Sequence, residues 1–319
     1  MKADDVRKVA VIGAGTMGPG IADEFARWGR EVVLTEPDAD RLAAGLQSIR
    51  SAHEVLKGAQ LLTPEEGSDA LSRLRLTTSL EEACEGADLV VEAITENLEA
   101  KLTLFRRLDA LTSAHAVLAS NTSGLSITQI ASAVSNPTRV CGMHFFNPAY
   151  VVPLVEIIQG DETTDENAGV LYDICEAMGK QPVRVRRDVP GFIANRLQFA
   201  VFREAVHLLE TGVATAEDID RALQAGPGFR YVFMGQLKTA DMAGLDVFLA
   251  IASYLFADLS NATSPPDLLR QLVERGNTGV KAGRGFFDHA DGAGERLEQE
   301  RDRVLLAVRR LLTGLDGAS

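Results

Sequence analysis

Cysteine is scarce in this sequence, and its few cysteines are scattered. The 319 residues include only Cys84, Cys141 and Cys175, and no two of them have the CxxC spacing of a metal or redox site. The five histidines do not cluster with them. An odd and dispersed set of thiols argues against a disulfide framework and against a metal site, and it predicts a cytoplasmic protein.

Positive charge and long apolar runs are also in short supply. The formal net charge of −13 argues against a nucleic-acid partner, because such partners bind basic surfaces. No apolar run is long enough to span a membrane, and the start of the chain does not have the pattern of a signal peptide. Hydrophobic residues nevertheless make up 46% of the chain, enough for a sizeable core and two domains. We therefore expect a small-molecule substrate rather than a nucleic acid or a membrane.

Short apolar runs alternate with amphipathic helical patterns through the first part of the chain. The runs expected to form strands lie at residues 9–13, 31–36, 87–94, 115–121, 139–146, 152–158 and 181–187. Helical patterns lie between most of them, notably at 17–28, 38–57, 98–111 and 165–178. This alternation predicts an α/β fold with a doubly wound, mainly parallel sheet of the Rossmann type.

The pattern becomes wholly helical after the PGF stretch at 190–192. Expected helices lie at 192–210, 215–225, 239–258, 264–276 and, in the charged tail, 294–314. Thr215 and Asp218 have the spacing of a capping box. We therefore expect an α/β domain at residues 1–188 and an all-α domain at residues 189–319.

The glycines that follow the first expected strand have the spacing Gly-x-Gly-x-x-Gly. They are Gly13, Gly15 and Gly18, and they lie between a strand and a helix, the context in which this motif is specific for dinucleotides. The first permits a tight turn, the second lets a pyrophosphate approach the backbone, and the third lets the helix pack on the strand. With Thr16 and Met17 they are the candidate pyrophosphate site at a helix N-terminus.

Glu36 ends the second expected strand, where dinucleotide-binding domains carry the acidic residue that binds the adenosine ribose. A carboxylate accepts hydrogen bonds from both ribose hydroxyls and repels a 2′-phosphate. The position therefore predicts NAD rather than NADP as the cofactor. The competing interpretation is a solvated glutamate at a strand end.

The apolar stretch 142–157 carries a histidine near one end and a glutamate near the other. The stretch reads GMHFFNPAYVVPLVEI, and a turn at Asn147 would bring His144 and Glu156 together on two neighbouring strands. Oxidation of an alcohol needs a base for the hydroxyl proton, which histidine supplies at neutral pH, and a carboxylate would fix its tautomer. The competing interpretation is a histidine packed in the core.

Several motifs together resemble the 3-hydroxyacyl-CoA dehydrogenase family. In chain order they are VVEAITENLEAK (90–101), VLASNTSGLSIT (117–128), MHFFNP (143–148), PLVEI (153–157) and DVPGFIANRL (188–197). The resemblance implies an NAD-binding Rossmann domain, a helical C-terminal domain and a homodimer formed through that domain. It further implies that His144 is the catalytic base, that Glu156 is its partner, and that Ser123 and Asn195 bind the substrate oxygen.

Each of these residues has a structural alternative. Ser123 would then be the N-cap of a following helix, and Asn195 a surface residue of another. The resemblance also implies a set of contacts to the nicotinamide half of the cofactor: Glu96, Lys101, Asn121, Asn147 and Lys281. For Lys101 the alternative is an exposed charge pair with Glu96, and for Lys281 a basic residue of a loop.

The sequence departs from this family at two places. The helical segment 46–63 carries only two basic residues, Arg50 and Lys57, where acyl-CoA enzymes are rich in lysine. The stretch 225–246 contains an inserted Gly-Phe-Arg-Tyr that resembles members acting on free acids, among them gulonate, carnitine and a pyridine carboxylate of vitamin B6 breakdown. Arg230 in this insertion is the candidate anchor for a substrate carboxylate, with a solvated loop residue as the alternative.

We therefore expect an NAD-dependent oxidoreductase that converts the 3-hydroxyl of a 3-hydroxyacyl substrate, of the CoA type, to a ketone. One alternative is a free carboxylated substrate, either a hydroxy acid or an aromatic aldehyde oxidised through its hydrate. Another is a non-catalytic NAD-binding or structural protein, which the intact set of candidate catalytic residues disfavours.

Overall fold

The computed structural model describes residues 2–316, which divide into two compact units. The second unit is Arg196–Glu300, and the first holds the chain through Asn195 and again from Arg301 onward. The division therefore lies beyond the expected residue 188, and the tail expected in the helical domain belongs to the first unit. The reason is packing, because Leu306 is buried against side chains of the first unit.

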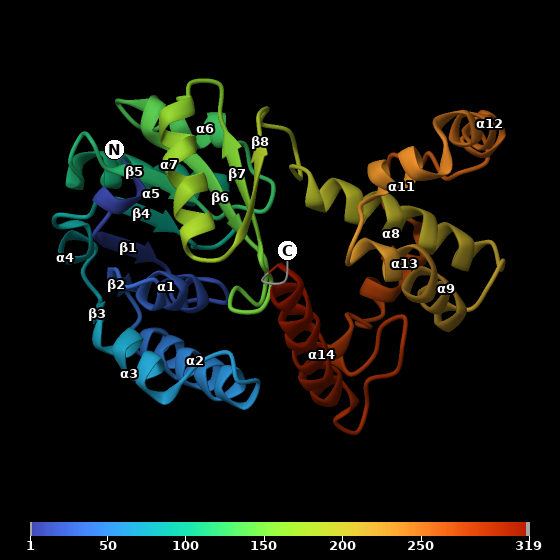
Figure 1. The fold of residues 1–319 in the computed structure, drawn as a ribbon, viewed down its shortest axis with the longest axis horizontal. Coiled ribbons are helices and arrows are strands. Elements are labelled where there is room, and N and C mark those ends of the chain that lie inside the picture. Colours follow the sequence, from blue (N-terminus) through green and yellow to red (C-terminus); the bar gives the residue numbers. More distant parts are fainter. Residues whose placement is uncertain (1, 317–319) are drawn as a thin grey trace. The chain divides into compact units, whose positions relative to one another are not determined.

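In the described residues, eight strands form one sheet in the order β3-β2-β1-β4-β5-β6-β7-β8 (Figure 1). Their bounds are β1 (Lys8–Ile12), β2 (Glu31–Thr35), β3 (Leu74–Thr77), β4 (Leu89–Glu92), β5 (Val117–Ser120), β6 (Val140–Phe145), β7 (Leu154–Gln159) and β8 (Gln181–Val185). All neighbouring strands are parallel except β6 and β7. The prediction of a doubly wound, mainly parallel sheet is confirmed.

Alternate strand residues point to opposite faces of the sheet, and helices cover both faces. The helices of this unit are α1 (Gly18–Arg27), α2 (Ala39–Gly58), α3 (Pro64–Ser72), α4 (Leu80–Cys84), α5 (Leu98–Leu111), α6 (Ile127–Ala131) and α7 (Asp165–Ala177), with short 3₁₀ turns at Ala3–Asp5 and Pro137–Arg139. Val11 of β1 lies in one core cluster with Phe25 of α1, and its neighbour Ile12 lies in another with Phe105 of α5. Because most of the strands are parallel, their carboxyl ends lie together at one end of the sheet, where the motif residues gather.

Several short elements of the first unit, among them β3, α3 and α4, were not expected. β3 is an edge strand that is only half-buried, so its residues show no continuous apolar run. α3 begins with a capping box in which Thr63 and Glu66 satisfy each other's backbone N–H groups. The side chain of Ser79 caps α4.

The second unit is helical, as predicted. Its elements are α8 (Ala194–Glu210, which begins in the first unit), α9 (Ala216–Leu223), a π-helical turn (Gln224–Gly228), α10 (Phe229–Tyr231), α11 (Gln236–Ala243), α12 (Leu245–Leu255), α13 (Asp267–Glu274), a 3₁₀ turn (Val280–Ala282) and the start of α14 (Ala293–Asp316). The single helix expected at 239–258 is wrong. Gly244 has a φ of 99° and separates α11 from α12, since that conformation cannot continue a right-handed helix. No helix of the described residues is long and apolar enough to cross a bilayer.

Candidate active site

The loop after β1 uses its three glycines in different ways. A Cβ on Gly13, whose φ is 105°, would lie 2.7 Å from the Ala93 carbonyl oxygen, and one on Gly18 would lie 1.7 Å from that of Gly13. Both glycines are thus required by the protein itself. A Cβ on Gly15 would meet nothing within 4 Å, so this residue leaves open space beside the backbone. Met17, the N-cap of α1, makes no side-chain cap bond, which suits a helix N-terminus that receives an anion.

Glu36 stands next to this loop at the end of β2. Its Oε2 atom accepts a hydrogen bond from the backbone N–H of Ala14, at 3.2 Å. The carboxylate is therefore fixed against the glycine loop and is only half-buried, with an oxygen left for a further partner. The open space at Gly15, the uncapped helix start and this carboxylate together fit the pyrophosphate and ribose of a dinucleotide.

His144 and Glu156 face each other across the antiparallel pair β6 and β7. His144 Nδ1 lies 2.8 Å from Glu156 Oε2, and the two side chains are almost completely buried. The other carboxylate oxygen, Oε1, accepts the backbone N–H groups of Ile193 and Ala194, each at 2.9 Å, where α8 begins. The turn expected between the strands therefore does bring the two residues together.

The hydrogen bonds around Glu156 keep it ionised. Burial acts to raise the pKa of this carboxyl, but the hydrogen bonds from His144, Ala194 and Ile193 outweigh burial and lower the pKa below its usual value of 4.5. Because an ionised carboxylate only accepts hydrogen bonds, the proton of a neutral His144 belongs on Nδ1. Nε2 is then an acceptor, and an imidazole in this state can take a proton from a substrate hydroxyl.

Ser123 is the exposed residue of the loop that follows β5, and three contacts hold that loop. Its backbone N–H donates to Glu96 Oε1 at 2.9 Å, and the Thr122 hydroxyl donates to the same oxygen at 2.6 Å. Asn195 Nδ2 donates to the Ser123 carbonyl oxygen at 2.9 Å. Ser123 is not the N-cap of the next helix, as the structural alternative required. The cap is Ser126, whose side chain accepts from the backbone N–H of Gln129.

Lys101 is not part of an exposed charge pair, because only 1% of its surface is accessible. Its Nζ atom lies 2.5 Å from Glu92 Oε1 and 3.5 Å from Glu96 Oε2. The other oxygen of Glu92 accepts the Ser120 hydroxyl at 2.6 Å. Glu92 was missed in the sequence, although a glutamate that ends the apolar strand LVVE is a signal for a buried partner.

Two asparagines of the predicted cofactor set lie at the same edge of the sheet. Asn121 is buried, and its Oδ1 accepts the backbone N–H of Phe145 at 2.7 Å, which ties β5 to the end of β6. Asn147 is exposed in the turn that follows β6. Phe146 stacks obliquely on His144, with ring centroids 4.4 Å apart. The strand ends thus surround the imidazole with rigid neighbours.

Comparison with family models decides the relationship. The model of the 3-hydroxyacyl-CoA dehydrogenase NAD binding domain matches residues 8–189, and that of the 3-hydroxyacyl-CoA dehydrogenase C-terminal domain matches residues 191–289. The chain belongs to the 3-hydroxyacyl-CoA dehydrogenase family. The resemblance seen in the sequence is confirmed, and so is NAD as the cofactor of this oxidoreductase.

Individual family members match most of the chain. A 5-formyl-3-hydroxy-2-methylpyridine 4-carboxylate 5-dehydrogenase from Mesorhizobium japonicum is 37% identical over 311 residues, 97% of this chain and 99% of that one. A 3-hydroxybutyryl-CoA dehydrogenase from Mycobacterium tuberculosis is 39% identical over 291 residues, 90% and 100% of the two chains. A crystal structure of a 5-formyl-3-hydroxy-2-methylpyridine 4-carboxylic acid 5-dehydrogenase, described as an NAD+ dependent dismutase, superposes with a TM-score of 0.91 at 36% identity and covers 97% of this chain and 99% of that one.

Two of the candidate site residues of this chain lie in its second unit. Arg230 is exposed in α10, and Lys281 is exposed in the 3₁₀ turn at Val280–Ala282. Their roles toward substrate and cofactor stay predictions.

We expect Lys101→Met to destabilise the first unit strongly. The substitution leaves the Glu92 carboxylate buried without its cation, a change that costs about 3–5 kcal/mol in the free energy of unfolding. Lys57→Met is the matched control, since Lys57 pairs with Glu54 at 2.9 Å on the surface and such pairs contribute about 1 kcal/mol or less. Urea unfolding of both variants measures the difference, and equal losses would contradict the importance of the buried pair.

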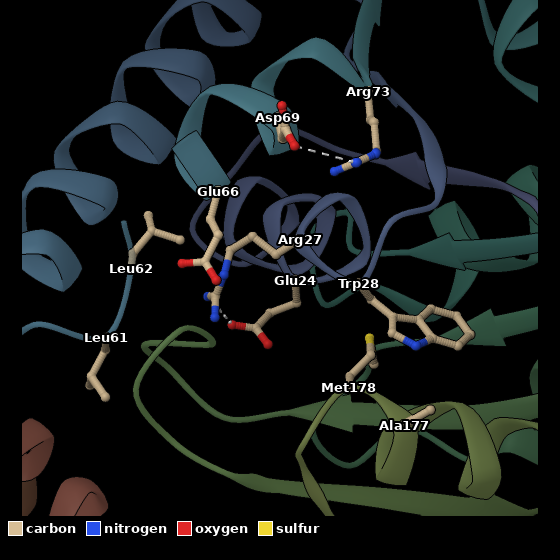
Figure 2. A pocket seen from close by; sticks show the side chains of 10 residues that line it. All are labelled: Glu24, Arg27, Trp28, Leu61, Leu62, Glu66, Asp69, Arg73, Ala177 and Met178. Carbon is tan, nitrogen blue, oxygen red and sulfur yellow. Dashed lines mark hydrogen bonds and ion pairs between the residues drawn. The ribbon is translucent and has the colours of Figure 1, made fainter. Parts of the chain in front are cut away.

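A pocket lies elsewhere in the first unit, between α1, α3 and the end of α7 (Figure 2). Its volume is about 420 Å³, and its lining residues are Glu24, Arg27, Trp28, Leu61, Leu62, Glu66, Asp69, Arg73, Ala177 and Met178. None of these is a predicted site residue. Ion pairs already join its opposite charges, Arg27 with Glu24 at 3.0 Å and Arg73 with Asp69 at 3.9 Å.

Proposed function

We propose that the protein oxidises the 3-hydroxyl of a 3-hydroxyacyl substrate to a ketone, with His144 as the base. The observation that supports this is the buried His144–Glu156 pair. It lies at the end of the sheet where the parallel strands have their carboxyl ends and where the glycine loop also lies. NAD, when bound, supplies the hydride acceptor for the hydrogen on the hydroxyl carbon. The hydroxyl proton passes to Nε2 of His144 as the carbon–oxygen double bond forms.

The other candidate residues bind and orient in this proposal. The Ser123 hydroxyl and the Asn195 amide hold the substrate oxygen near His144, and Glu156 stabilises the imidazolium that forms. Gly13, Gly15, Thr16, Met17 and Gly18 hold the pyrophosphate, and Glu36 holds the ribose. The residues assigned to the nicotinamide half are Glu96, Lys101, Asn121, Asn147 and Lys281. For Lys101 the buried pair with Glu92 supports an indirect part, in which it holds Glu96 and so the Ser123 loop.

A second substrate class has a specific observation in its favour. The solved pyridine carboxylate dehydrogenase superposes on this chain with a TM-score of 0.91, whereas a 3-hydroxyacyl-CoA dehydrogenase from Archaeoglobus fulgidus that covers the same 97% of the chain reaches 0.68. Of the two cations in the segment expected to meet a CoA phosphate, Lys57 is already paired with Glu54. A small carboxylated hydroxy acid, or an aldehyde hydrate, anchored by Arg230 is the second candidate substrate.

A substrate panel read as NADH formation distinguishes the two classes. The panel compares 3-hydroxybutyryl-CoA, free 3-hydroxybutyrate and an aromatic aldehyde carboxylate in the wild type, Arg230→Ala and Arg221→Ala. If a free carboxylate is the substrate, Arg230→Ala lowers kcat/KM for it about 10–100-fold, since a hydrogen bond to a charged group contributes about 1.5–3 kcal/mol. Arg221, which pairs with Asp218 at 2.9 Å, is the control. Turnover of the CoA ester alone, unchanged in Arg230→Ala, supports the first class, and equal rates with NADP would contradict the assignment of Glu36.

We further propose that the protein is a cytoplasmic homodimer. Large apolar side chains of the second unit are exposed, among them Phe199 at 62%, Phe233 at 86% and Leu249 at 69%, which favours burial against a second copy. The three cysteines are unpaired and buried, and burial raises the pKa of Cys84 to about 11 and that of Cys141 to about 12. Light scattering at micromolar concentration tests the dimer, and a monomeric mass would contradict it.

A further inference from the structure

The turn between the two strands of the His144–Glu156 pair is bound by cations from distant parts of the chain. Lys180, which is buried before β8, donates to the Ala149 carbonyl oxygen and lies 3.5 Å from that of Val152. Arg309, near the end of α14, donates to the Tyr150 carbonyl oxygen at 2.7 Å. Three carbonyl groups of one turn are therefore held by two positive side chains, which restricts how the turn can move.

The C-terminal helix makes two further contacts with the same turn. Asp302 accepts the hydroxyl of Tyr150 at 2.9 Å. Leu306, only 2% exposed, packs with Val151 in a small core cluster that also holds Leu56 and Leu62. We call residues 301–312, the part of α14 in the first unit whose side chains are described, the C-terminal clasp. It lies outside both ranges matched by the family models, 8–189 and 191–289.

The cations at the turn are tied to the helix that follows the glycine loop. Lys180 Nζ lies 2.9 Å from Glu24 Oε2 of α1, and Glu24 also pairs with Arg27, as Figure 2 shows. Burial lowers the pKa of Lys180, and Glu24 opposes that shift. Burial likewise lowers the pKa of Arg309, and the charge of Glu24 opposes that shift. The turn and the clasp are thus linked through Lys180, Arg309 and Glu24 to α1, the helix that follows the glycine loop.

We propose that the C-terminal clasp positions the 148–152 turn for catalysis, with Arg309 and Tyr150 as positioning residues. The turn starts directly after Asn147 and joins the strand of His144 to the strand of Glu156. A displacement of about 1 Å at a reacting group costs up to about 100-fold in rate, although the protein stays folded and binds its cofactor. The inference rests on the proposed function, in which His144 is the base and Asn147 contacts the cofactor, since the clasp is inferred to position the turn that follows both.

The test compares two arginines of the same clasp in the full-length chain. Arg309→Gln removes the guanidinium that donates to the turn, whereas Arg310 lies away from the turn and donates to Gln60 at 3.3 Å. Both changes remove one positive charge from one helix. We expect kcat to fall about tenfold in Arg309→Gln, with the Kd for NADH changed less than about twofold, and to stay near the wild-type value in Arg310→Gln. Arg309→Lys keeps a charged donor and should restore most of the rate.

Two further variants separate this inference from the proposed function. Tyr150→Phe removes only the hydroxyl bond to Asp302 and should lower kcat about two- to fivefold, while the thermal midpoint falls by no more than a few degrees. His144→Ala is assayed beside them. If His144→Ala is inactive but Arg309→Gln and Arg310→Gln have the same kcat, the clasp has no positioning role and the proposed function stands. If His144→Ala retains its turnover, the proposed function itself is wrong.

Discussion

His144→Ala should lose about 10²–10⁴-fold in kcat, because a positioned acid–base group contributes that much to proton transfer. The imidazole is almost fully buried, with Nδ1 paired to Glu156 at 2.8 Å, and a water molecule that enters the vacated space is a far weaker base than an imidazole. The dinucleotide loop around Gly13 is built by other residues. Binding of NADH, followed by its fluorescence, should therefore change less than about twofold.

His115→Ala is the matched control for this substitution. His115 is exposed in the same unit and its ring contacts the Ser113 hydroxyl at 3.2 Å, away from the strand pair. Its turnover should equal that of the wild type. Comparable turnover of His144→Ala and the wild type would remove the base from the mechanism, and an inactive wild type with normal NADH binding would favour the non-catalytic alternative.

Much of the sheet can be predicted from the sequence because its central strands are buried on both faces. VAVIG, and LVV within ADLVVEAI, are continuous apolar runs for that reason. β3 lies at the edge and is partly exposed, so LRLT carries an arginine and gives no such signal. Gly244 shows the same limit in the helical unit, because a glycine within an apolar helical pattern does not reveal that its φ is positive.

The site is predictable where partners lie on neighbouring strands and obscure where they are far apart in the chain. His144 and Glu156 are twelve positions apart, and a single turn suffices to pair them. Glu92 and Lys101 follow one another closely, yet their pairing depends on how α5 returns over β4, which no spacing rule gives. The bond from Arg309 to Tyr150 joins residues 159 positions apart, after the whole second unit has intervened. Only the folded chain reveals it.

Glu156→Gln should lower kcat strongly, although the new side chain has the same shape as the glutamate. The amide oxygen can still accept the N–H groups of Ile193 and Ala194. The amide nitrogen then faces Nδ1 of His144 and donates to it, which moves the imidazole proton to Nε2. An Nε2–H cannot accept the substrate proton. A wrong tautomer of this kind costs about 10⁴-fold in kcat in a serine protease triad, and we expect about 10³–10⁴-fold here.

The same substitution has a pH signature in stability. The pKa of Glu156 is lowered in the folded protein below its usual 4.5, so its contribution to folding is fully present above about pH 4.5 and is lost as the pH falls through the folded-state value. The destabilisation of Glu156→Gln, measured by urea unfolding, should therefore shrink as the pH falls below about 4. Glu65→Gln, at an exposed position in the first turn of α3, controls for the loss of one charge. If Glu156→Gln keeps its turnover, the carboxylate does not set the tautomer of His144. If its stability deficit is independent of pH down to acid unfolding, the ionised pair does not stabilise the fold.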